Sequence, residues 1–125
     1  MKLDGQLVLS LVPELLTRAA HFEELRPGVE IARLYAAEAD GSTAAFLRYA
    51  PGAEVPWHRH AGYEHVLVLH GEQHDDRGRY TAGTLVINPP GSEHRVASSE
   101  GCLALLIWQK PVVFLSSPPE PRPRA

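Results

Sequence analysis

Five of the chain's seven histidines lie between positions 58 and 74. His58 and His60 form an H-x-H pair, and a β-strand presents alternate residues on the same side. A strand over this pair would therefore direct both imidazoles into one cavity. Glu64 follows after a short turn and could add a carboxylate beside them. Further along, the rigid Pro-Pro-Gly turn of "NPPGSEH" can aim a third imidazole, that of His94, from the edge of a loop.

Three neutral imidazoles and one carboxylate are a ligand set that suits zinc, iron, manganese, nickel or copper. We therefore expect one divalent metal ion per chain, with open coordination positions if the ion takes five or six ligands. The alternative is that these histidines are surface or core residues that only form hydrogen bonds, and an isolated H-x-H pair does not exclude it. The expected ligands are His58, His60, Glu64 and His94.

The other histidines of the cluster are not expected to join this site. His65 has the opposite parity to Glu64 and should face the other side of a strand. His70 shares the parity of Glu64, but at ~3.3 Å per residue it lies about 20 Å further along. His74 begins the polar turn "HDDRG" and is expected to be a solvated loop residue. The charged residues after it are likewise expected to form a solvated hairpin: Asp75, Asp76, Arg77 and Arg79.

The elements that must position these residues are short extended segments. Runs such as "TAAFLRYA", "EHVLVLHG" and "CLALLIWQKPVVFL" are rich in β-branched, aromatic and other apolar residues, and turns rich in Gly, Pro and Asp separate them. Pro111 is expected to separate two strands or to mark the edge of a sheet. Only "PELLTRAAHFEEL" has a possible helical period. Many short strands with regular turns predict an antiparallel β-sandwich or barrel.

The totals are those of one globular domain. A chain of 125 residues is long enough to bury one hydrophobic core. A formal charge of −3 argues against nucleic acid and against an anionic membrane surface. No apolar run approaches the ~20 residues that cross a bilayer, so no membrane span is expected. Cys102 has no partner for an internal disulfide, which favours a cytoplasmic location and a buried structural thiol.

Two longer motifs contain the expected ligands. "GAEVPWHRHAGYEHVLVLHG" fits the first cupin motif, G-x5-H-x-H-x3-E-x6-G, from Gly52 to Gly71. "GTLVINPPGSEHRVAS" is similar to the second motif, G-x5-P-x-G-x2-H-x3-N, with Ser98 in place of the final Asn. In cupins that position supports the site rather than ligating the metal. The sequence thus resembles the cupins, which implies an all-β antiparallel jelly roll (an RmlC-like double-stranded β-helix) and a metal bound by His58, His60, Glu64 and His94.

A narrower resemblance is to the ChrR-type cupins, carried by "PGAEVPWHRH", "NPPGSEH" and "EGCLALLIWQKPVVFL". In that family the cupin is the C-terminal half of zinc-dependent anti-sigma factors and also occurs as a free-standing domain. Residues 1–27 contain a single His and no Cys. The separate helical zinc domain of the anti-sigma factors is therefore not expected, and sigma-factor binding is not implied.

The expected organisation is an N-terminal arm at 1–27, a cupin domain at 28–115 and a Pro-rich flexible tail at 116–125. The arm should pair with the sandwich edge or cross to a partner, and strands that are apolar on both faces indicate a homodimer. Two functions are favoured for a metal-binding cupin, and a third that occurs among cupins, sugar epimerisation or isomerisation, has no specific support in the sequence. The first is a metal-dependent dioxygenase acting on a small organic molecule. The second is a non-catalytic zinc-bound sensor or small-ligand-binding module.

Overall fold

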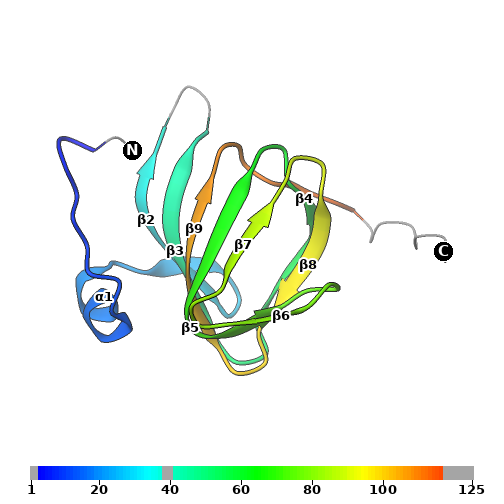
Figure 1. Cartoon of the computed structure of the whole chain (residues 1–125), viewed down its shortest axis with the longest axis horizontal. Helices are drawn as coiled ribbons and strands as arrows, with labels where there is room; N and C mark the ends of the chain where they lie inside the picture. Colours follow the sequence, from blue (N-terminus) through cyan, green and yellow to red (C-terminus); the bar gives the residue numbers. More distant parts are fainter. Residues whose placement is uncertain (1–2, 38–40, 117–125) are drawn as a thin grey trace.

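The computed structural model describes residues 3–37 and 41–116, so nearly all of the expected tail lies outside the described residues. The described part contains one short helix and ten strands, and the strands form one antiparallel sheet that curls over itself (Figure 1). The all-β jelly-roll expectation is confirmed. The elements are α1 (Pro13–Ala19), β1 (Glu23–Arg26), β2 (Val29–Ala36), β3 (Thr43–Tyr49), β4 (Glu54–Arg59), β5 (Glu64–His74), β6 (Arg79–Thr81), β7 (Leu85–Asn88), β8 (Glu93–Ala97), β9 (Cys102–Trp108) and β10 (Val113–Phe114).

The longest strand, β5, joins the two halves of the curled sheet. The strand order is β1-β2-β3-β9-β5-β8-β4-β10, and β6 and β7 also pair with β5. The first part of β5 pairs with β7 and β9, whereas its end pairs with β6 and β8. Gly71 lies near this change of partners with φ of 73°. A Cβ atom at Gly71 would overlap the carbonyl oxygen of Gly101, so only glycine fits.

The main core lies inside the curl. In β5 the side chains from Glu64 to Val68 alternate between buried and half-buried, as expected for a strand with one face toward the core. Pro111 lies between β9 and β10, so the expected separation of two strands is confirmed. The buried core residues are Val29, Ile31, Ala45, Leu47, Tyr49, Val55, Val66, Val68, Val96, Cys102, Ala104 and Leu106.

A second apolar cluster lies on the outer side of the sheet. Leu16 of α1 is buried there against Ala32, Phe46 and Leu103, which come from β2, β3 and β9. In Figure 1, α1 accordingly lies outside the curl, on the side of β2. Strands that are apolar on both faces need cover on the outside of the sheet. The N-terminal segment provides part of that cover.

The expected helical period ends earlier than "PELLTRAAHFEEL" suggests. The helix stops at Ala19, and Glu23–Arg26 form the edge strand β1, which pairs with β2. A short isolated helix is marginal in water, whereas pairing with β2 satisfies the backbone of this segment. The sheet thus begins inside the segment expected to be an arm.

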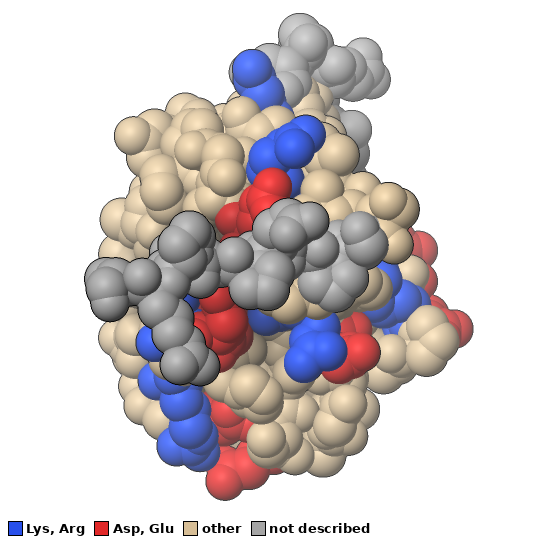
Figure 2. Space-filling view, turned by 90° about the vertical axis from the view of Figure 1, so that its right-hand side faces the viewer, with Lys and Arg blue, Asp and Glu red and all other residues tan. Residues whose placement is uncertain are grey.

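Charged side chains of both signs lie on the outside of the sheet, among uncharged residues (Figure 2). On the face shown in Figure 2, basic and acidic residues lie next to one another. The outward side chains of β4 and β8 pair in the same way, with 4.0 Å between Arg59 and Glu93 and 4.0 Å between Arg95 and Glu54. None of the helical structure in the described residues has the length and apolarity needed to span a bilayer.

Candidate metal centre

The pairing of β4 with β8 brings two of the expected ligands together. His58 lies directly opposite His94 in this pair. His60 lies one residue beyond β4, where its N–H donates to the Ser92 carbonyl (2.9 Å) and its carbonyl accepts from the Gly91 N–H (2.8 Å). The three imidazole rings have centroids 4.7–5.1 Å apart, and one ligand nitrogen from each lies within 4.8 Å of the others.

Hydrogen bonds orient all three rings in the same way. The Nδ1 atom of each ring faces a carbonyl or carboxylate oxygen, which can only accept a hydrogen bond. Each Nδ1 therefore carries the proton, and each Nε2 keeps a lone pair. The acceptors are the Pro56 carbonyl for His58 (2.7 Å), the Ser92 carbonyl and hydroxyl for His60 (3.1 and 2.8 Å), and the Asp75 carboxylate for His94 (3.0 Å).

The Nε2 atoms have no protein donor to accept from. Those of His60 and His94 are buried and have no hydrogen-bond partner among the residues that the structure describes. Nε2 of His60 also lies 3.3 Å from Oε1 of Glu64, so two electron-rich atoms face each other. A cation between them would replace this repulsion by attraction. In a tetrahedral zinc site with zinc–nitrogen bonds of about 2.0–2.1 Å, two ligand nitrogens lie about 3.4 Å apart. Because the ligand nitrogens of the cluster lie within 4.8 Å of one another, the rings would move toward one another by up to about 1.4 Å when they bind one ion.

The protonation states also suit a cation. Burial, reinforced by the neighbouring His94 and His60, lowers the pKa of His58 to about 4. Burial likewise lowers the pKa of His94. Burial alone would raise the pKa of Glu64, but attraction to the neighbouring rings in their protonated form, first of all that of His60, outweighs burial and the pKa is lowered. At neutral pH this is a cluster of neutral His58 and His94 beside a carboxylate, which are the forms that bind metal.

Glu64 is positioned by its neighbours in the sheet. It is the first residue of β5 and lies opposite Asn88 of β7 and Trp108 of β9. The Asn88 side-chain amide donates to Oε1 of Glu64 (3.2 Å). The carboxylate thus lies at the side of the imidazole cluster, next to His60. The three imidazoles form a group close enough to hold a metal ion, and Glu64 lies next to one of them, His60.

Sequence reasoning missed the residue that supports His94. Asp75 was expected to be solvated, but its side chain is only 3% exposed. Besides accepting from His94, it accepts from the Tyr80 hydroxyl (2.9 Å) through its other oxygen. The expectation of a solvated hairpin is therefore wrong for Asp75. A carboxylate behind a ligand imidazole is a common arrangement, but the sequence does not show which carboxylate comes close.

The other histidines of the histidine-rich stretch 58–74 lie outside the three-imidazole group. His65 is half-buried, and His70 is exposed just after an irregularity in the β5–β9 pairing. His74 is not a loop residue: it ends β5, and its Nδ1 lies 3.3 Å from a carboxylate oxygen of Glu72.

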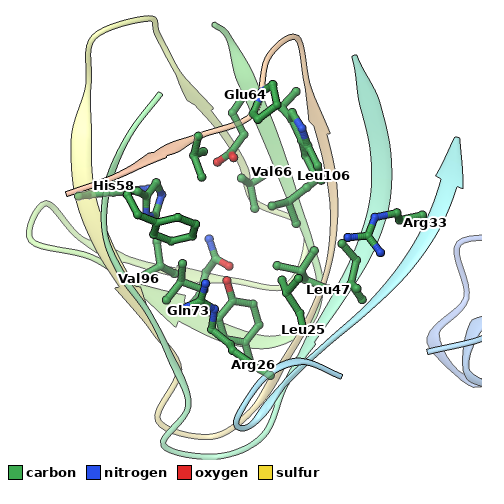
Figure 3. A pocket seen from close by; sticks show the side chains of 18 residues that line it. Leu25, Arg26, Arg33, Leu47, His58, Glu64, Val66, Gln73, Val96 and Leu106 are labelled. Atoms are coloured by element: carbon green, nitrogen blue, oxygen red, sulfur yellow. The ribbon is translucent and has the colours of Figure 1, made fainter. Parts of the chain in front are cut away.

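A largely apolar cavity of about 240 Å³ opens onto the imidazole cluster (Figure 3). His58, Glu64 and His94 form part of its wall. The aromatic residues Tyr49 and Trp108 line this cavity, whereas Phe46 belongs to the outer cluster. The other lining residues are Leu25, Arg26, Ile31, Arg33, Leu47, Val55, Val66, Gln73, Val96, Leu106, Pro111, Val112 and Phe114.

Residues 15–112 match the family described as the ChrR Cupin-like domain. The chain belongs to this family. The resemblance drawn from the two motifs is thereby confirmed. A buried three-histidine cluster that could bind a metal ion is thus a feature of this ChrR cupin-like domain.

Three known proteins are similar to this chain, two in sequence and one in structure. The anti-sigma-E factor ChrR of Cereibacter sphaeroides is 35% identical over 83 residues, which is 64% of this chain and 39% of ChrR. DddL of the same organism, named as a candidate dimethylsulfoniopropionate lyase, is 30% identical over 88 residues, 62% of this chain and 38% of DddL. The chain thus spans about two fifths of the length of these two relatives.

The third is a solved structure, an acetylacetone dioxygenase from Acinetobacter johnsonii. It superimposes with a TM-score of 0.75 at 13% identity, covering 93% of this chain and 82% of that one. At this identity the likeness shows the shared fold alone.

Proposed function

We propose that one divalent metal ion binds at the imidazole cluster and serves a reaction on a small organic molecule in the adjoining cavity. The observation that carries the proposal is a cluster of three imidazoles in which Nε2 of His60 and of His94 is buried without a partner among the described residues. His58 and His94 of this cluster form part of the wall of an apolar cavity. Buried polar atoms without partners lower the stability of the fold, and a bound metal ion would offset this cost by accepting their lone pairs. The proposed ligands are His58, His60, Glu64 and His94.

The reaction class we favour is oxygen-dependent cleavage or oxidation of the substrate. A redox-active ion such as iron supplies electron exchange with oxygen when bound, whereas zinc polarises a carbonyl or binds an anion. The protein's own part is to hold the imidazoles through Asp75, Ser92 and Pro56, and to keep bulk water from the substrate. Apolar side chains such as Val66 and Val96 in the cavity wall support that second role.

A non-catalytic role is the second candidate, and the match to ChrR favours it. In this case zinc would occupy the same ligands, and the domain would respond to a small ligand without turnover. The match to DddL adds a different reaction class, a lyase, which needs no oxygen. These alternatives predict different metals and different products.

Reconstitution with iron and with zinc separates the candidates. Protein purified without added metal should carry close to one divalent ion per chain. The iron form should consume oxygen with a member of a panel of small diketones, phenolic ketones and flavonols, and activity should vanish in zinc-substituted protein and in His94→Ala. Dimethylsulfoniopropionate is tested in parallel for cleavage without oxygen. If zinc copurifies and the protein shows neither oxygen uptake nor cleavage, the result would favour the non-catalytic binding module over the enzyme.

We also propose that the domain forms a homodimer through the exposed outer face of β7 and β9. Ile87 and Ile107 both lie opposite His65, one on each side of β5, so they share one face. Leu85, Ile87 and Ile107 are 55%, 51% and 42% exposed. Contiguous apolar residues of this kind are typical of an interface.

Sedimentation velocity tests the dimer. The wild-type chain should sediment as a dimer, and Ile87→Glu should convert it to a monomer because the interface would bury an unpaired charge. Val113→Glu, which changes an exposed residue of β10, should leave the dimer intact. A wild-type chain that is monomeric at tens of micromolar would contradict the proposal.

A further inference from the structure

The cavity wall contains a cation without an anionic partner. Arg26, at the end of β1, lines the cavity, and its Nε is buried without a hydrogen-bond partner. Among the ion pairs of the described residues, none involves Arg26. Arg26 as a whole is half-buried, and its guanidinium stays charged at any pH the protein meets. A buried donor such as its Nε normally has a partner. The Nε donor of Arg26 is therefore not used by any of the residues that the structure describes.

A second arginine in the same wall differs in this respect. Arg33 also lines the cavity, but its guanidinium lies 2.8 Å from a carboxylate oxygen of Glu23. This charge is balanced on the surface of the β1–β2 pair. The two arginines are thus a natural comparison, because only one of them is left unpaired toward the cavity.

Arg26 is held in place by an aromatic ring that also approaches the proposed metal centre. Its guanidinium carbon lies 4.8 Å from the centre of the Phe114 ring. The centre of the same ring is 6.0 Å from that of His58. Phe114 therefore bridges the cation and the imidazole cluster, and both border the same cavity.

Polar groups gather around Arg26, while the walls between it and the cluster are apolar. Figure 3 shows Arg26 beside Gln73, on the opposite side of the cavity from Glu64. Gln73 and Tyr49 are both buried in this wall, and each offers a hydrogen-bond donor. Leu47, Val96 and other apolar side chains complete the walls. The cavity thus has a polar cationic end and a metal-binding end.

We propose that this cavity binds a small organic anion, with its carboxylate paired to Arg26 and its apolar body extending toward the imidazole cluster. The inference rests on the proposed function, because the metal centre defines the reacting end of the ligand. Pairing with Arg26 itself needs no metal. Carboxylates suit a guanidinium because its donors match their two oxygens in geometry and charge.

The test compares benzoate with benzamide, which have nearly the same shape and differ in charge. Calorimetric titration of zinc-loaded protein should give an affinity for benzoate at least tenfold above that for benzamide. Arg26→Gln should lower benzoate affinity at least tenfold, because a charge-assisted pair is lost, and leave benzamide unchanged. Arg33→Gln is the matched control and should stay within twofold of wild type. Arg26→Lys, which keeps the charge, should restore part of the benzoate affinity.

Metal content and the melting temperature of each variant are measured beside the titrations. Equal affinity for the two probes, no binding of either, or equal losses in Arg26→Gln and Arg33→Gln would overturn the proposal. Benzoate binding that needs zinc but survives Arg26→Gln would also overturn it, since the anion would then sit on the metal. A protein that binds no metal refutes the proposed function separately, because the dependence on Arg26 can still be measured in metal-free protein.

Discussion

Replacing His58, His60 or His94 by alanine should lower zinc affinity by at least about a hundredfold, because changes in residues that merely support a ligand already cost ten- to a hundredfold. Each imidazole contributes a ligand nitrogen to the cluster, and alanine leaves that coordination position empty. Competition with a chelator gives the affinity, and elemental analysis gives the metal content per chain.

The controls come from the same stretch of sequence. His65→Ala, His70→Ala and His74→Ala should keep full metal content, since none of these rings belongs to the cluster. Asp75→Ala should fall between the two groups because it releases the Nδ1 proton of His94 from its acceptor, whereas the exposed neighbour in Asp76→Ala should have no effect. Full occupancy in a His58→Ala, His94→Ala double variant would refute the metal centre.

Gly71→Ala should destabilise the fold by about 4 kcal/mol or more, the range reached by severe overpacking of a core. The added Cβ would meet the Gly101 carbonyl oxygen, which is backbone and cannot rotate away. The positive φ adds a smaller penalty for any residue with a side chain. Urea unfolding measures the change, and loss of soluble protein would be the extreme form of the same result.

Gly83→Ala separates these two causes. Gly83 has φ of 89°, but a Cβ there meets nothing within 4 Å. Only the conformational penalty applies, so we expect a loss of about 1–2 kcal/mol. Similar losses in both variants would show that the overlap at Gly71 is relieved by movement of the turn around Gly101.

The four proposed ligands could be predicted from the sequence because the signals for them lie in short local motifs. His58 and His60 are two residues apart, and a rigid turn precedes His94. The strands were accessible for the same reason, since turn residues mark their ends. The N-terminal helix was placed correctly at its start, but its end at Ala19 depends on pairing between β1 and β2, which is a tertiary effect.

The residues that support the proposed ligands could not be predicted from the sequence, because their roles depend on contacts between distant segments. Asp75 reaches His94 across nineteen positions of the chain, and Asn88 reaches Glu64 across twenty-four. Arg26 lies outside both motifs and meets the cavity only because β1 forms the edge of the sheet. Patterns of residue type report local structure, whereas these contacts follow from strand register.

Cys102 is the chain's only thiol, and because it is buried its reactivity reports local opening of the sheet. Burial, with the nearby charge of Glu72, raises the pKa of Cys102 to about 12, and the residue is 4% exposed at the start of β9. Almost no thiolate exists at neutral pH in the folded protein, so a chromogenic disulfide reagent reacts only after β9 opens from β3 and β5. The rate of colour formation therefore follows that opening without any engineered label.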